Sequence, residues 1–593
     1  MPANAGVASG PVRPPAHGTA RRHPSDDTIP DASPDPAISD FGIILHDAID
    51  EADNRFQPQA IRTKKVEEMP EMKSRYALFC LAAGSLLVPT IASAQNMHSF
   101  SQGPATVDLS EVAARPAKAC DDLAFLTTYD YTIFGAELVP ASGETPEHCR
   151  LDGFIRPEIR FEVNLPTDWN GRFYMHGNGG FAGTQPGQGS RGATRDAALA
   201  QGFATAYTDT GHDSNVFPLA TFAFKDMAAE VDYSYRSIYL TAITAQDLVA
   251  DYYGQPDSYS YWDGCSTGGR QGLVFAQRFP TVFDGIVAGA PVLNFTDIMI
   301  EFVWNTLALE SAETLTAGQL KTMSDVVYEK CDAVDGAQDG LIRDPRQCAF
   351  DPATDLPVCT GEASDSCLTQ AQVDAVSRVY GGTMSNGRTY FPGQPVSAER
   401  ADAKGNSGWN GWLVSDGPSR QAQYGRSFME NMAFLPDDPD RDWRSFDFDK
   451  DPSQITTIRK LLDTTNPDLS AFHEAGGHML TYFGWADTAL NPMMGIGYYE
   501  DVMSKMGNAT ADTYRLFMVP GMFHCRGGVG PEEIDAMAAM VDWVEGGVAP
   551  DRLIATTRGK PDGATQLLCP YPEKVTYSGE GSPMKAENWN CAR

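Results

Sequence analysis

The chain has 593 residues and a formal net charge of −33, with 42% hydrophobic and 10% aromatic residues. This composition is typical of a globular protein, and the length is too great for one small domain and sufficient for a large core. A nucleic-acid partner would need a basic face on the protein, so the acidic charge argues against nucleic-acid binding.

The N-terminal part of the chain reads as two pieces. Residues 1–71 are rich in Pro, Asp, Ala and Arg without sustained periodicity, which predicts a disordered extension or a start assigned too early. The stretch MKSRYALFCLAAGSLLVPTIASAQ has a basic start, a short apolar run and an Ala-Ser-Ala ending. This pattern predicts a signal peptide over residues 72–94, although a buried helix is the alternative. The apolar run is short for a membrane span, so we expect a secreted or periplasmic protein without a membrane partner.

Export changes the interpretation of the eleven cysteines. One of them, Cys80, lies in the predicted signal peptide, and the remaining ten are an even number in an oxidising compartment. Pairing sequence neighbours predicts the disulfides with the shortest loops: Cys120–Cys149, Cys331–Cys348, Cys359–Cys367 and Cys569–Cys591. This pairing leaves Cys265 and Cys525 for each other, while the sequence alone leaves other connectivities open.

Six short apolar runs each end in a Gly-rich or polar turn. They lie at residues 172–183, 202–213, 259–269, 284–291, 478–487 and 514–525. Helical patterns separate some of these runs, and in residues 236–254 the apolar positions recur every three or four residues. Strands that alternate with helices predict an α/β fold with a largely parallel sheet, in which catalytic residues follow the carboxyl ends of strands.

The alternation of strands and helices is interrupted in the middle of the chain. Residues 296–466 contain four cysteines, several tryptophans and many Asp-Pro and Gly-rich turns. We interpret this segment as a lid inserted between two parts of a catalytic domain, residues 95–295 and residues 467–593. A lid in this position would cover the strand ends and help to form the substrate pocket.

The stretch YWDGCSTGGRQG contains G-x-S-x-G with Ser266 at its centre, which is typical of a serine nucleophile on a strand-to-helix turn. A plain Gly-rich turn would also explain the motif alone. In an α/β-hydrolase the acid and then the histidine follow the serine along the chain. Asp487 follows a predicted strand in GWAD and His524 follows the last one, whereas His473 and His478 precede any suitable acid. The predicted triad is therefore Ser266, Asp487 and His524.

An oxyanion hole requires two backbone N–H donors. The first should come from Thr267, directly after the nucleophile, and the second from the turn HGNGGFAG, where Gly179 and Gly180 are both candidates. We expect His176 in the same turn to be structural. A Cys265–Cys525 disulfide would join the neighbours of the catalytic serine and histidine, and so limit the drift of the base from the hydroxyl group.

The stretches GCSTGGRQG, GNGGFAG, GWAD and VPGMFHC together resemble the tannase and feruloyl esterase family. The resemblance extends roughly from Cys120 to the C-terminus. It implies an α/β-hydrolase fold with a large inserted lid, an activity on esters of aromatic acids, and catalytic roles for the three triad residues. It also implies the disulfide between the cysteines before the serine and after the histidine. The family includes mono(2-hydroxyethyl) terephthalate hydrolase as well.

The predicted lid contains the acidic stretch CDAVDGAQDGLIRDPRQC. Clustered carboxylates repel one another unless a hard cation lies among them, although a solvated acidic turn is the alternative. The stretch resembles the calcium site in the lid of this family. That resemblance implies structural Ca²⁺ bound by Asp332, Asp335 and Asp339 and by the carbonyl groups of Ala337 and Leu341.

The resulting functional hypothesis is an exported serine carboxylic ester hydrolase of the feruloyl esterase or tannase type. Its substrate would be a small aromatic ester or an ester derived from a plant polymer. A competing hypothesis is activity on terephthalate monoesters, but those members of the family carry a histidine at the position of Phe483. Two further hypotheses compete with the feruloyl esterase or tannase activity: a secreted serine peptidase of the same fold, and a non-catalytic binding protein.

Overall fold

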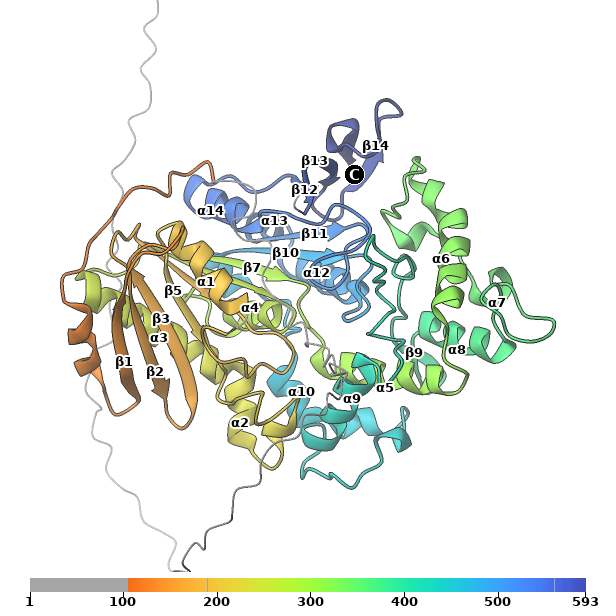
Figure 1. Cartoon of the computed structure of the whole chain (residues 1–593), viewed down its shortest axis with the longest axis horizontal. Coiled ribbons are helices and arrows are strands. Elements are labelled where there is room, and N and C mark those ends of the chain that lie inside the picture. The colour runs from red at the N-terminus through yellow and green to blue at the C-terminus, as the bar shows by residue number, and fades with distance from the viewer. Residues whose placement is uncertain (1–104, 189, 559) are drawn as a thin grey trace, which may run out of the picture. The chain divides into compact units, whose positions relative to one another are not determined.

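A computed structural model describes residues 105–188, 190–558 and 560–593, which all belong to one compact unit (Figure 1). The predicted N-terminal extension and signal peptide lie outside these residues. No helix in the described part of the chain is both long and apolar enough to cross a membrane.

A nine-stranded mixed sheet forms the centre of the fold, with the strand order β1-β2-β3-β5-β4-β6-β7-β10-β11. In this order, every neighbouring pair from β5 to β11 is parallel, and every neighbouring pair from β1 to β5 is antiparallel. The strands are β1 (Tyr131–Val139), β2 (His148–Ile155), β3 (Ile159–Pro166), β4 (Arg172–His176), β5 (Ala204–Thr208), β6 (Tyr259–Cys265), β7 (Gly285–Gly289), β10 (His478–Gly484) and β11 (Tyr514–Val519).

The six runs predicted as strands each contain a strand of the parallel part of this sheet. Every residue of β4, β5 and β7 is buried, as expected for parallel strands that are covered on both faces. The edge strand β1 instead has mostly half-buried or exposed residues. The α/β-hydrolase fold is therefore confirmed, and the antiparallel edge formed by β1, β2 and β3 adds to it.

Helices that follow the strands cover the sheet. Among them α3 contacts β5, α4 contacts β6 and β7, α12 contacts β10 and β11, and α14 contacts β7 and β10. The helices of this catalytic part are α1 (Ser190–Ala200), α2 (Met227–Val231), α3 (Ser237–Tyr253), α4 (Thr267–Arg278), α12 (Pro492–Met506), α13 (Ala509–Thr513) and α14 (Ala536–Gly546).

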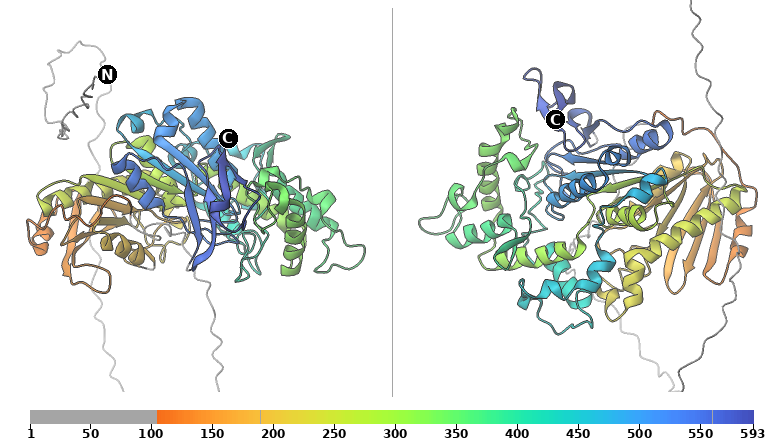
Figure 2. Two further views of the ribbon diagram at one scale, coloured as in Figure 1. Left: turned by 90° about the horizontal axis from the view of Figure 1, so that it is seen from above. Right: turned by 180° about the vertical axis from the view of Figure 1, so that it is seen from behind.

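The segment between β7 and β10 contains the predicted lid, residues 296–466, and adds no strand to the large sheet. We call this whole segment, including α11 beyond the predicted boundary, the lid. Its elements are α5 (Phe295–Glu310), α6 (Ala317–Cys331), α7 (Pro352–Asp355), α8 (Gln370–Gly381), β8 (Thr383–Ser385), β9 (Arg388–Phe391), α9 (Arg420–Asn431), α10 (Thr456–Leu462) and α11 (Ser470–Glu474). Part of the lid has its own hydrophobic core around Met323, Val376 and Trp409. The green helices α6, α7 and α8 lie at the end of the described unit opposite the orange strands (Figures 1 and 2).

Local sequence signals explain where two lid helices begin. Thr316 caps α6 and Thr369 caps α8, and in both helices the glutamine three residues later bonds back to the amide of the cap. Such capping boxes satisfy N–H groups that the first turn of a helix leaves unpaired. Regular helices therefore form in the lid although its sequence lacks the alternation of strands and helices seen in the catalytic part.

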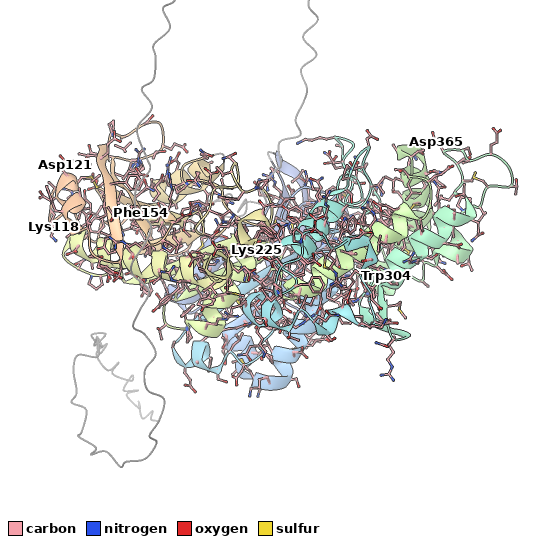
Figure 3. All side chains as sticks on the ribbon, turned by 90° about the horizontal axis from the view of Figure 1, so that it is seen from below. Lys118, Asp121, Phe154, Lys225, Trp304 and Asp365 are labelled. Carbon is pink, nitrogen blue, oxygen red and sulfur yellow. A yellow bond between two sulfur atoms is a disulfide. The ribbon has the colours of Figure 1, made fainter. Side chains whose placement is uncertain are left out.

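The C-terminal segment forms two small hairpins, β12 (Leu553–Thr557) with β13 (Lys560–Leu568) and β14 (Lys574–Tyr577) with β15 (Trp589–Ala592). All five predicted disulfides are present in the structure. Four of the disulfides close short loops between cysteines that are near in sequence, whereas Cys265–Cys525 joins positions 260 residues apart. Figure 3 places Asp365, in the loop closed by Cys359–Cys367, at the opposite end of the unit from Lys118 and Asp121.

Candidate active site

Ser266 lies on the turn between β6 and α4 with φ 64° and ψ −122°. A positive φ is uncommon for a residue other than glycine, and such strain is concentrated at functional sites. The amide of Ser266 donates to the carbonyl of Gly289 at 3.0 Å, and its own carbonyl accepts from the amide of Arg270 at 3.0 Å. The neighbouring strand and the first turn of α4 therefore hold this backbone in place.

Glycine at position 264 permits the sharp turn before the serine. A Cβ atom there would lie 2.5 Å from the carbonyl oxygen of Gly268 in the first turn of α4. Strand and helix could not approach this closely with a side chain between them. The two glycines of G-x-S-x-G beside Ser266 thus serve the packing of the turn that the motif predicts.

Asp487 and His524 follow the carboxyl ends of the adjacent strands β10 and β11. The Nδ1 atom of His524 lies 2.8 Å from Oδ2 of Asp487, which is fully buried. The other carboxylate oxygen, Oδ1, accepts from the amides of Ala489 and Leu490 at 2.9 Å each. A proton on Nδ1 that bonds to the carboxylate leaves Nε2 of the imidazole free to accept a proton.

The disulfide between Cys265 and Cys525 connects the residue before Ser266 with the residue after His524. Both cysteines are fully buried, and their Cα atoms are 6.0 Å apart. Cys525 also has a positive φ of 62°, and its Sγ atom lies 3.7 Å from Nε2 of His524. The serine and the histidine line the same cavity. The structure therefore brings the three predicted triad residues to one site.

The turn after β4 lies beside Ser266 and lines the same cavity. The carbonyl of Gly180 accepts from the hydroxyl groups of Thr267, at 2.5 Å, and Tyr233, at 3.0 Å. The amides of Gly179 and Gly180 donate to no acceptor among the described residues, and the amide of Thr267 begins α4 and so has no partner within the helix. Free donors are thus available at the positions predicted for the oxyanion hole.

His176 at the end of β4 is 2% exposed and stacks on Tyr207 with 4.7 Å between ring centroids. Burial and then the charges of Arg191 and Arg195 hold the pKa of His176 well below its usual range. The ring is therefore neutral, and it does not line the cavity. These observations agree with the structural role expected from the sequence.

The cavity at Ser266 has a volume of about 1620 Å³ and an aromatic wall. Phe181 stacks on Tyr424 of α9 at 5.3 Å between centroids, and Trp412 of the lid meets His524 edge-on at 5.6 Å. Two further lid aromatics, Trp409 and Phe434, are buried in the core and do not line the cavity. An aromatic ring bound beside Ser266 would have aromatic partners on this wall.

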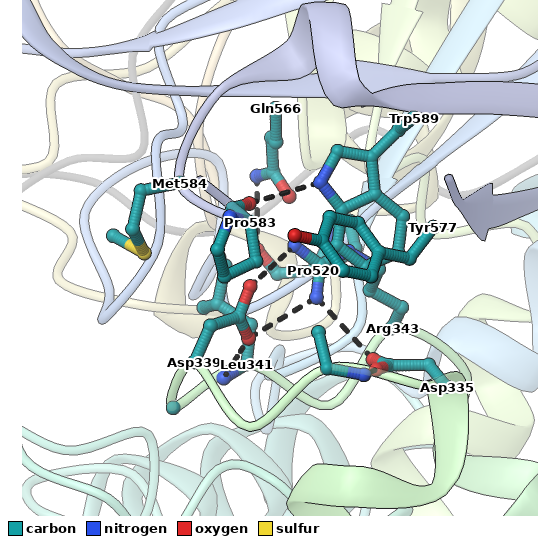
Figure 4. A network of polar contacts seen from close by, with 12 residues as sticks. Asp335, Asp339, Leu341, Arg343, Pro520, Gln566, Tyr577, Pro583, Met584 and Trp589 are labelled. Carbon is teal, nitrogen blue, oxygen red and sulfur yellow. Dashed lines mark hydrogen bonds and ion pairs between the residues drawn. The ribbon is translucent and has the colours of Figure 1, made fainter. Parts of the chain in front are cut away.

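The acidic loop of the lid lies against the C-terminal segment (Figure 4). The guanidinium group of Arg343 bonds to Asp339 at 2.7 and 3.2 Å and to Asp335 at 3.3 Å, and it lies 3.6 Å from the centroid of the Trp589 ring. Asp332 accepts from the amide of Gly340 at 2.8 Å. Sequence reasoning missed Arg343 as a partner of these carboxylates.

The donor chemistry of this loop fits Ca²⁺, because carboxylate and carbonyl oxygens are its preferred ligands. The present arrangement gives two carboxylates to Arg343, and no group of three acidic, histidine or cysteine side chains in the described part of the chain is arranged to hold a metal ion. Calcium at Asp332, Asp335, Asp339, Ala337 and Leu341 stays a prediction.

Phe483 in β10 is fully buried, and a Cβ atom on Gly495 would lie 2.8 Å from its ring. Its side chain does not line the cavity at Ser266. Position 483, directly before GWAD, is thus filled by a core phenylalanine.

The residues at the cavity that were not expected from the sequence include Phe181, Tyr424 and Arg526. Phe181 directly follows Gly179 and Gly180, and Arg526 follows His524 and Cys525, so a position next to a recognised motif could have indicated both. Tyr424 lies far from every motif, and no sequence signal marks it.

Comparison with known proteins places this geometry in a family. The sequence pattern of the family described as "Tannase and feruloyl esterase" matches residues 145–592. Mono(2-hydroxyethyl) terephthalate hydrolase of Piscinibacter sakaiensis is 34% identical over 77% of this chain and 87% of that relative. Feruloyl esterase B of Aspergillus niger is 28% identical over 74% of this chain and 84% of that relative.

Among solved structures, feruloyl esterase B from Aspergillus oryzae matches with a TM-score of 0.70 and 28% identity, over 80% of this chain and 99% of that one. A tannin acyl hydrolase from Aspergillus niger shares the fold, with a TM-score of 0.63. The family match covers most of the chain, and the relatives are matched over most of their length. The chain is therefore a carboxylic ester hydrolase of the tannase and feruloyl esterase family.

Proposed function

We propose that this enzyme hydrolyses esters of phenolic acids through an acyl-enzyme on Ser266. The observation that carries the proposal is one cavity that joins a strained serine, a histidine bonded to a buried aspartate, and an aromatic wall. An activity on esters of aromatic acids agrees with the names of the relatives. Export to an oxidising compartment belongs to the same proposal, supported by the five disulfides.

The proposed reaction has two stages. Nε2 of His524 takes the proton of the Ser266 hydroxyl as its oxygen attacks the ester carbonyl, and Asp487 stabilises the resulting imidazolium. The amide of Thr267 and that of Gly179 or Gly180 donate to the oxyanion. The histidine then protonates the leaving alcohol. In the second stage His524 activates water, which releases the acid and restores the serine.

Phenolic acids are favoured over terephthalate because of the groups around the site. Phe181, Tyr424 and Trp412 offer aromatic surface to an acyl ring, and offset or edge-on ring contacts are each worth about 0.5–1.5 kcal/mol beyond area burial. Phe483 supplies no hydrogen-bond donor where terephthalate-ester members carry a histidine. The acyl group is therefore expected to be recognised chiefly by its ring.

The test is a panel of esters: methyl ferulate, methyl gallate, methyl p-coumarate and mono(2-hydroxyethyl) terephthalate, with a ferulic amide as the control for peptidase activity. We expect the highest kcat/KM on a phenolic ester and no turnover of the amide. Preference for aliphatic esters, or comparable turnover of the amide, would contradict the proposal. Reaction with a fluorophosphonate excludes a non-catalytic binding protein.

For the acidic loop of the lid we propose calcium as a structural ligand. Arg343 pairs with Asp335 and Asp339, while Asp332 accepts from the amide of Gly340 and has Arg400 as its nearby positive charge. Three carboxylates thus share two guanidinium groups, which leaves one excess negative charge at buried or half-buried positions. A divalent oxygen-loving cation would balance this excess. Calcium can bind Asp335 and Asp339 only if Arg343 releases them. The guanidinium group of Arg343 therefore competes with calcium for these two carboxylates.

Arg343 provides the sharpest test of the calcium proposal. We expect chelation to lower the Tm of the wild type with little effect on kcat, Arg343→Met to bind calcium more tightly, and Asp332→Asn to bind it more weakly. Calorimetric titration with CaCl₂ and elemental analysis measure these effects. A metal-free wild type whose Tm responds to neither chelator nor calcium would leave Arg343 as the cation of the loop and end the proposal.

A further inference from the structure

Two hydroxyl groups converge on one backbone carbonyl beside the nucleophile, that of Gly180 in the turn after β4. The hydroxyl group of Thr267 donates to this carbonyl at 2.5 Å, and the hydroxyl group of Tyr233 donates to it at 3.0 Å. A carbonyl oxygen has two lone pairs, so the two bonds use its whole accepting capacity. The peptide group that follows Gly180 is therefore held in one orientation.

Gly180 has unusual backbone freedom at a place where orientation matters. Its φ is 57°, in the left-handed region that glycine enters without steric cost. A larger residue could not restrict this position, because a Cβ atom on Gly180 would lie 2.5 Å from the hydroxyl oxygen of Tyr424. The amides of Gly179 and Gly180 are the candidate oxyanion donors of this turn, so a rotation at Gly180 would turn them away from the oxyanion.

Tyr233 lies in a π-helical turn, Asp232–Arg236, that directly precedes α3. Such turns are rare and occur frequently at functional sites. The Tyr233 side chain is fully buried and does not line the cavity, so it can influence the substrate only through other residues. Burial raises the pKa of Tyr233 to about 12, and the hydroxyl group therefore keeps the proton that it donates to Gly180.

A buried arginine joins this π-helical turn to the nucleophile. The guanidinium group of Arg270 in α4 donates to the carbonyls of Tyr233 at 3.2 Å and Ser234 at 3.1 Å, and it lies 5.2 Å from the centroid of the Tyr233 ring. The backbone amide of the same arginine donates to the carbonyl of Ser266 at 3.0 Å. Because hydrogen bonds from a charged donor are strong, Tyr233 is held firmly relative to the turn that carries Ser266.

We propose that Tyr233 and the side chain of Thr267 are positioning residues, which keep the oxyanion hole formed by holding the carbonyl of Gly180. The amide of Thr267 is itself an expected oxyanion donor, so its hydroxyl group joins the two halves of the hole, the turn after β4 and the first turn of α4. Both hydroxyl groups stabilise the transition state only through the placement of backbone donors. This inference rests on the proposed acyl-enzyme mechanism and adds the residues that support its oxyanion hole.

The test removes one hydroxyl group at a time. Tyr233→Phe deletes the donor to Gly180 but keeps the ring that lies beside Arg270. Tyr253→Phe is the matched control, because the hydroxyl group of Tyr253 at the end of α3 donates to the backbone carbonyl of Pro166 at 2.6 Å. Tyr253 is likewise buried and does not line the cavity, so the control removes the same group from the same kind of bond elsewhere.

Three quantities are measured for each variant: kcat on methyl ferulate, the inhibition constant of phenylboronic acid, and the inhibition constant of ferulate. The boronic acid imitates the transition state, since Oγ of Ser266 adds to boron as its proton passes to His524. The tetrahedral boronate then places an oxygen in the oxyanion hole. Ferulate is the product of the reaction and has no tetrahedral centre, so it reports ground-state binding.

We expect Tyr233→Phe to lower kcat by about 10- to 100-fold, less than the loss of a whole oxyanion donor, because the donors are displaced and not removed. The inhibition constant of phenylboronic acid should rise by a similar factor, whereas that of ferulate should stay within about twofold of the wild type. Tyr253→Phe should leave all three quantities near their wild-type values. CD spectra and Tm values show whether each variant is folded.

A second pair of variants tests the same carbonyl from α4, and it decides the matter if Tyr233→Phe does not fold. Thr267→Val lacks the hydroxyl group that donates to Gly180, and Thr267→Ser retains it. Both keep the backbone amide of the oxyanion hole. We expect Thr267→Val to show the same pattern of losses as Tyr233→Phe and Thr267→Ser to retain most of kcat and of the affinity for phenylboronic acid.

Three results overturn the inference. A wild-type kcat and a wild-type affinity for phenylboronic acid in folded Tyr233→Phe, or in folded Thr267→Val, show that the bonds to Gly180 do not support the oxyanion hole. Equal losses of affinity for phenylboronic acid and ferulate indicate a general distortion of the cavity instead. If Ser266→Ala binds phenylboronic acid as tightly as the wild type does, the proposed acyl-enzyme mechanism itself fails, and the inference fails with it.

Discussion

The sheet side and the lid side of the active cavity are built differently. Ser266, Asp487 and His524 follow the ends of three parallel strands, and backbone bonds and a disulfide hold them. Trp412 and Tyr424 on the lid side are half-buried and contact the cavity through their rings. In the proposed mechanism the sheet therefore holds the reacting residues in place. The lid contributes aromatic side chains that contact the substrate and can be replaced without moving those residues. Changes on the two sides should therefore affect different kinetic parameters.

The largest expected effect is on the sheet side, at the nucleophile. Ser266→Ala should lower kcat by about 10⁴-fold or more, because no other hydroxyl group in the proposed mechanism can form the acyl-enzyme. Steady-state assays on methyl ferulate measure this loss, and an unchanged Tm shows that folding survives. A residual rate above a few per cent of the wild type would move the nucleophile elsewhere.

The disulfide beside the triad provides the second test. Replacing Cys265 and Cys525 by alanine should lower kcat by roughly 100-fold in a folded protein, because small displacements of a base from its partner are this costly. The cross-link spans 260 residues, and loops of that length are worth about 5 kcal/mol of stability by chain-entropy estimates, so assays belong at low temperature.

The matched control for this change is the lid disulfide Cys359–Cys367, which spans eight residues. Its double alanine variant should keep kcat near the wild-type value, since it touches neither the triad nor the cavity lining. Equal losses in both double variants, or a wild-type kcat in the first, would mean that Cys265–Cys525 only stabilises the fold.

On the lid side, Trp412→Leu should raise KM for methyl ferulate by about 10-fold and change kcat much less, because the ring contacts substrate in ground state and transition state alike. Trp304→Leu is the control: its ring packs edge-on against Phe448 and does not line the cavity. A loss in kcat alone after the Trp412 change would instead assign that ring to the support of His524.

The smallest expected effect is on stability and depends on pH. Burial raises the pKa of Glu301 in α5 to about 8, from the usual 4.5, so the folded protein favours the protonated carboxyl group. Its contribution to stability is complete below about pH 4.5 and is lost as the pH rises through 8. Glu301→Gln, an amide without this titration, should gain a few degrees of Tm relative to the wild type between pH 5 and 9.

Glu310→Gln at the end of the same helix is the control for the pH effect. Glu310 is 44% exposed and pairs with Arg444, so Glu310→Gln makes the same chemical change in the same helix but outside the buried core. Parallel pH profiles of Glu301→Gln and the wild type would show that the Glu301 carboxyl group does not titrate as its burial indicates.

The parts of the site that depend on chain order were predictable from the sequence. Ser266, Asp487 and His524 each follow an apolar run, and the parallel order of those runs brings their ends together. Disulfide pairing was predictable because four pairs close short loops and leave one pair beside the triad. The parallel strands were predictable because each is a short, buried apolar run.

Features that depend on side-chain packing between distant segments were not predictable. Tyr424 of α9 reaches Phe181 only because the lid folds over the sheet, and no local pattern marks that contact. Arg343 belongs to an acidic turn in the sequence, yet its guanidinium group lies between two carboxylates and the ring of Trp589, near the C-terminal end of the chain. The strands β1, β2 and β3 were missed because each mixes polar and apolar residues: β1 is an edge strand with exposed positions, and β3 buries the polar Glu162 and Asn164.

The central claim is that Ser266 carries the acyl group during ester hydrolysis. Rapid acid quenching of a reaction with p-nitrophenyl ferulate, followed by reduction and peptide mass mapping, tests it most directly. The proposed mechanism predicts a feruloyl adduct on the peptide that contains Ser266, with none on the same peptide of Ser266→Ala. An adduct on any other residue, or ferulate release without an adduct under conditions that show a burst of nitrophenol, would contradict it.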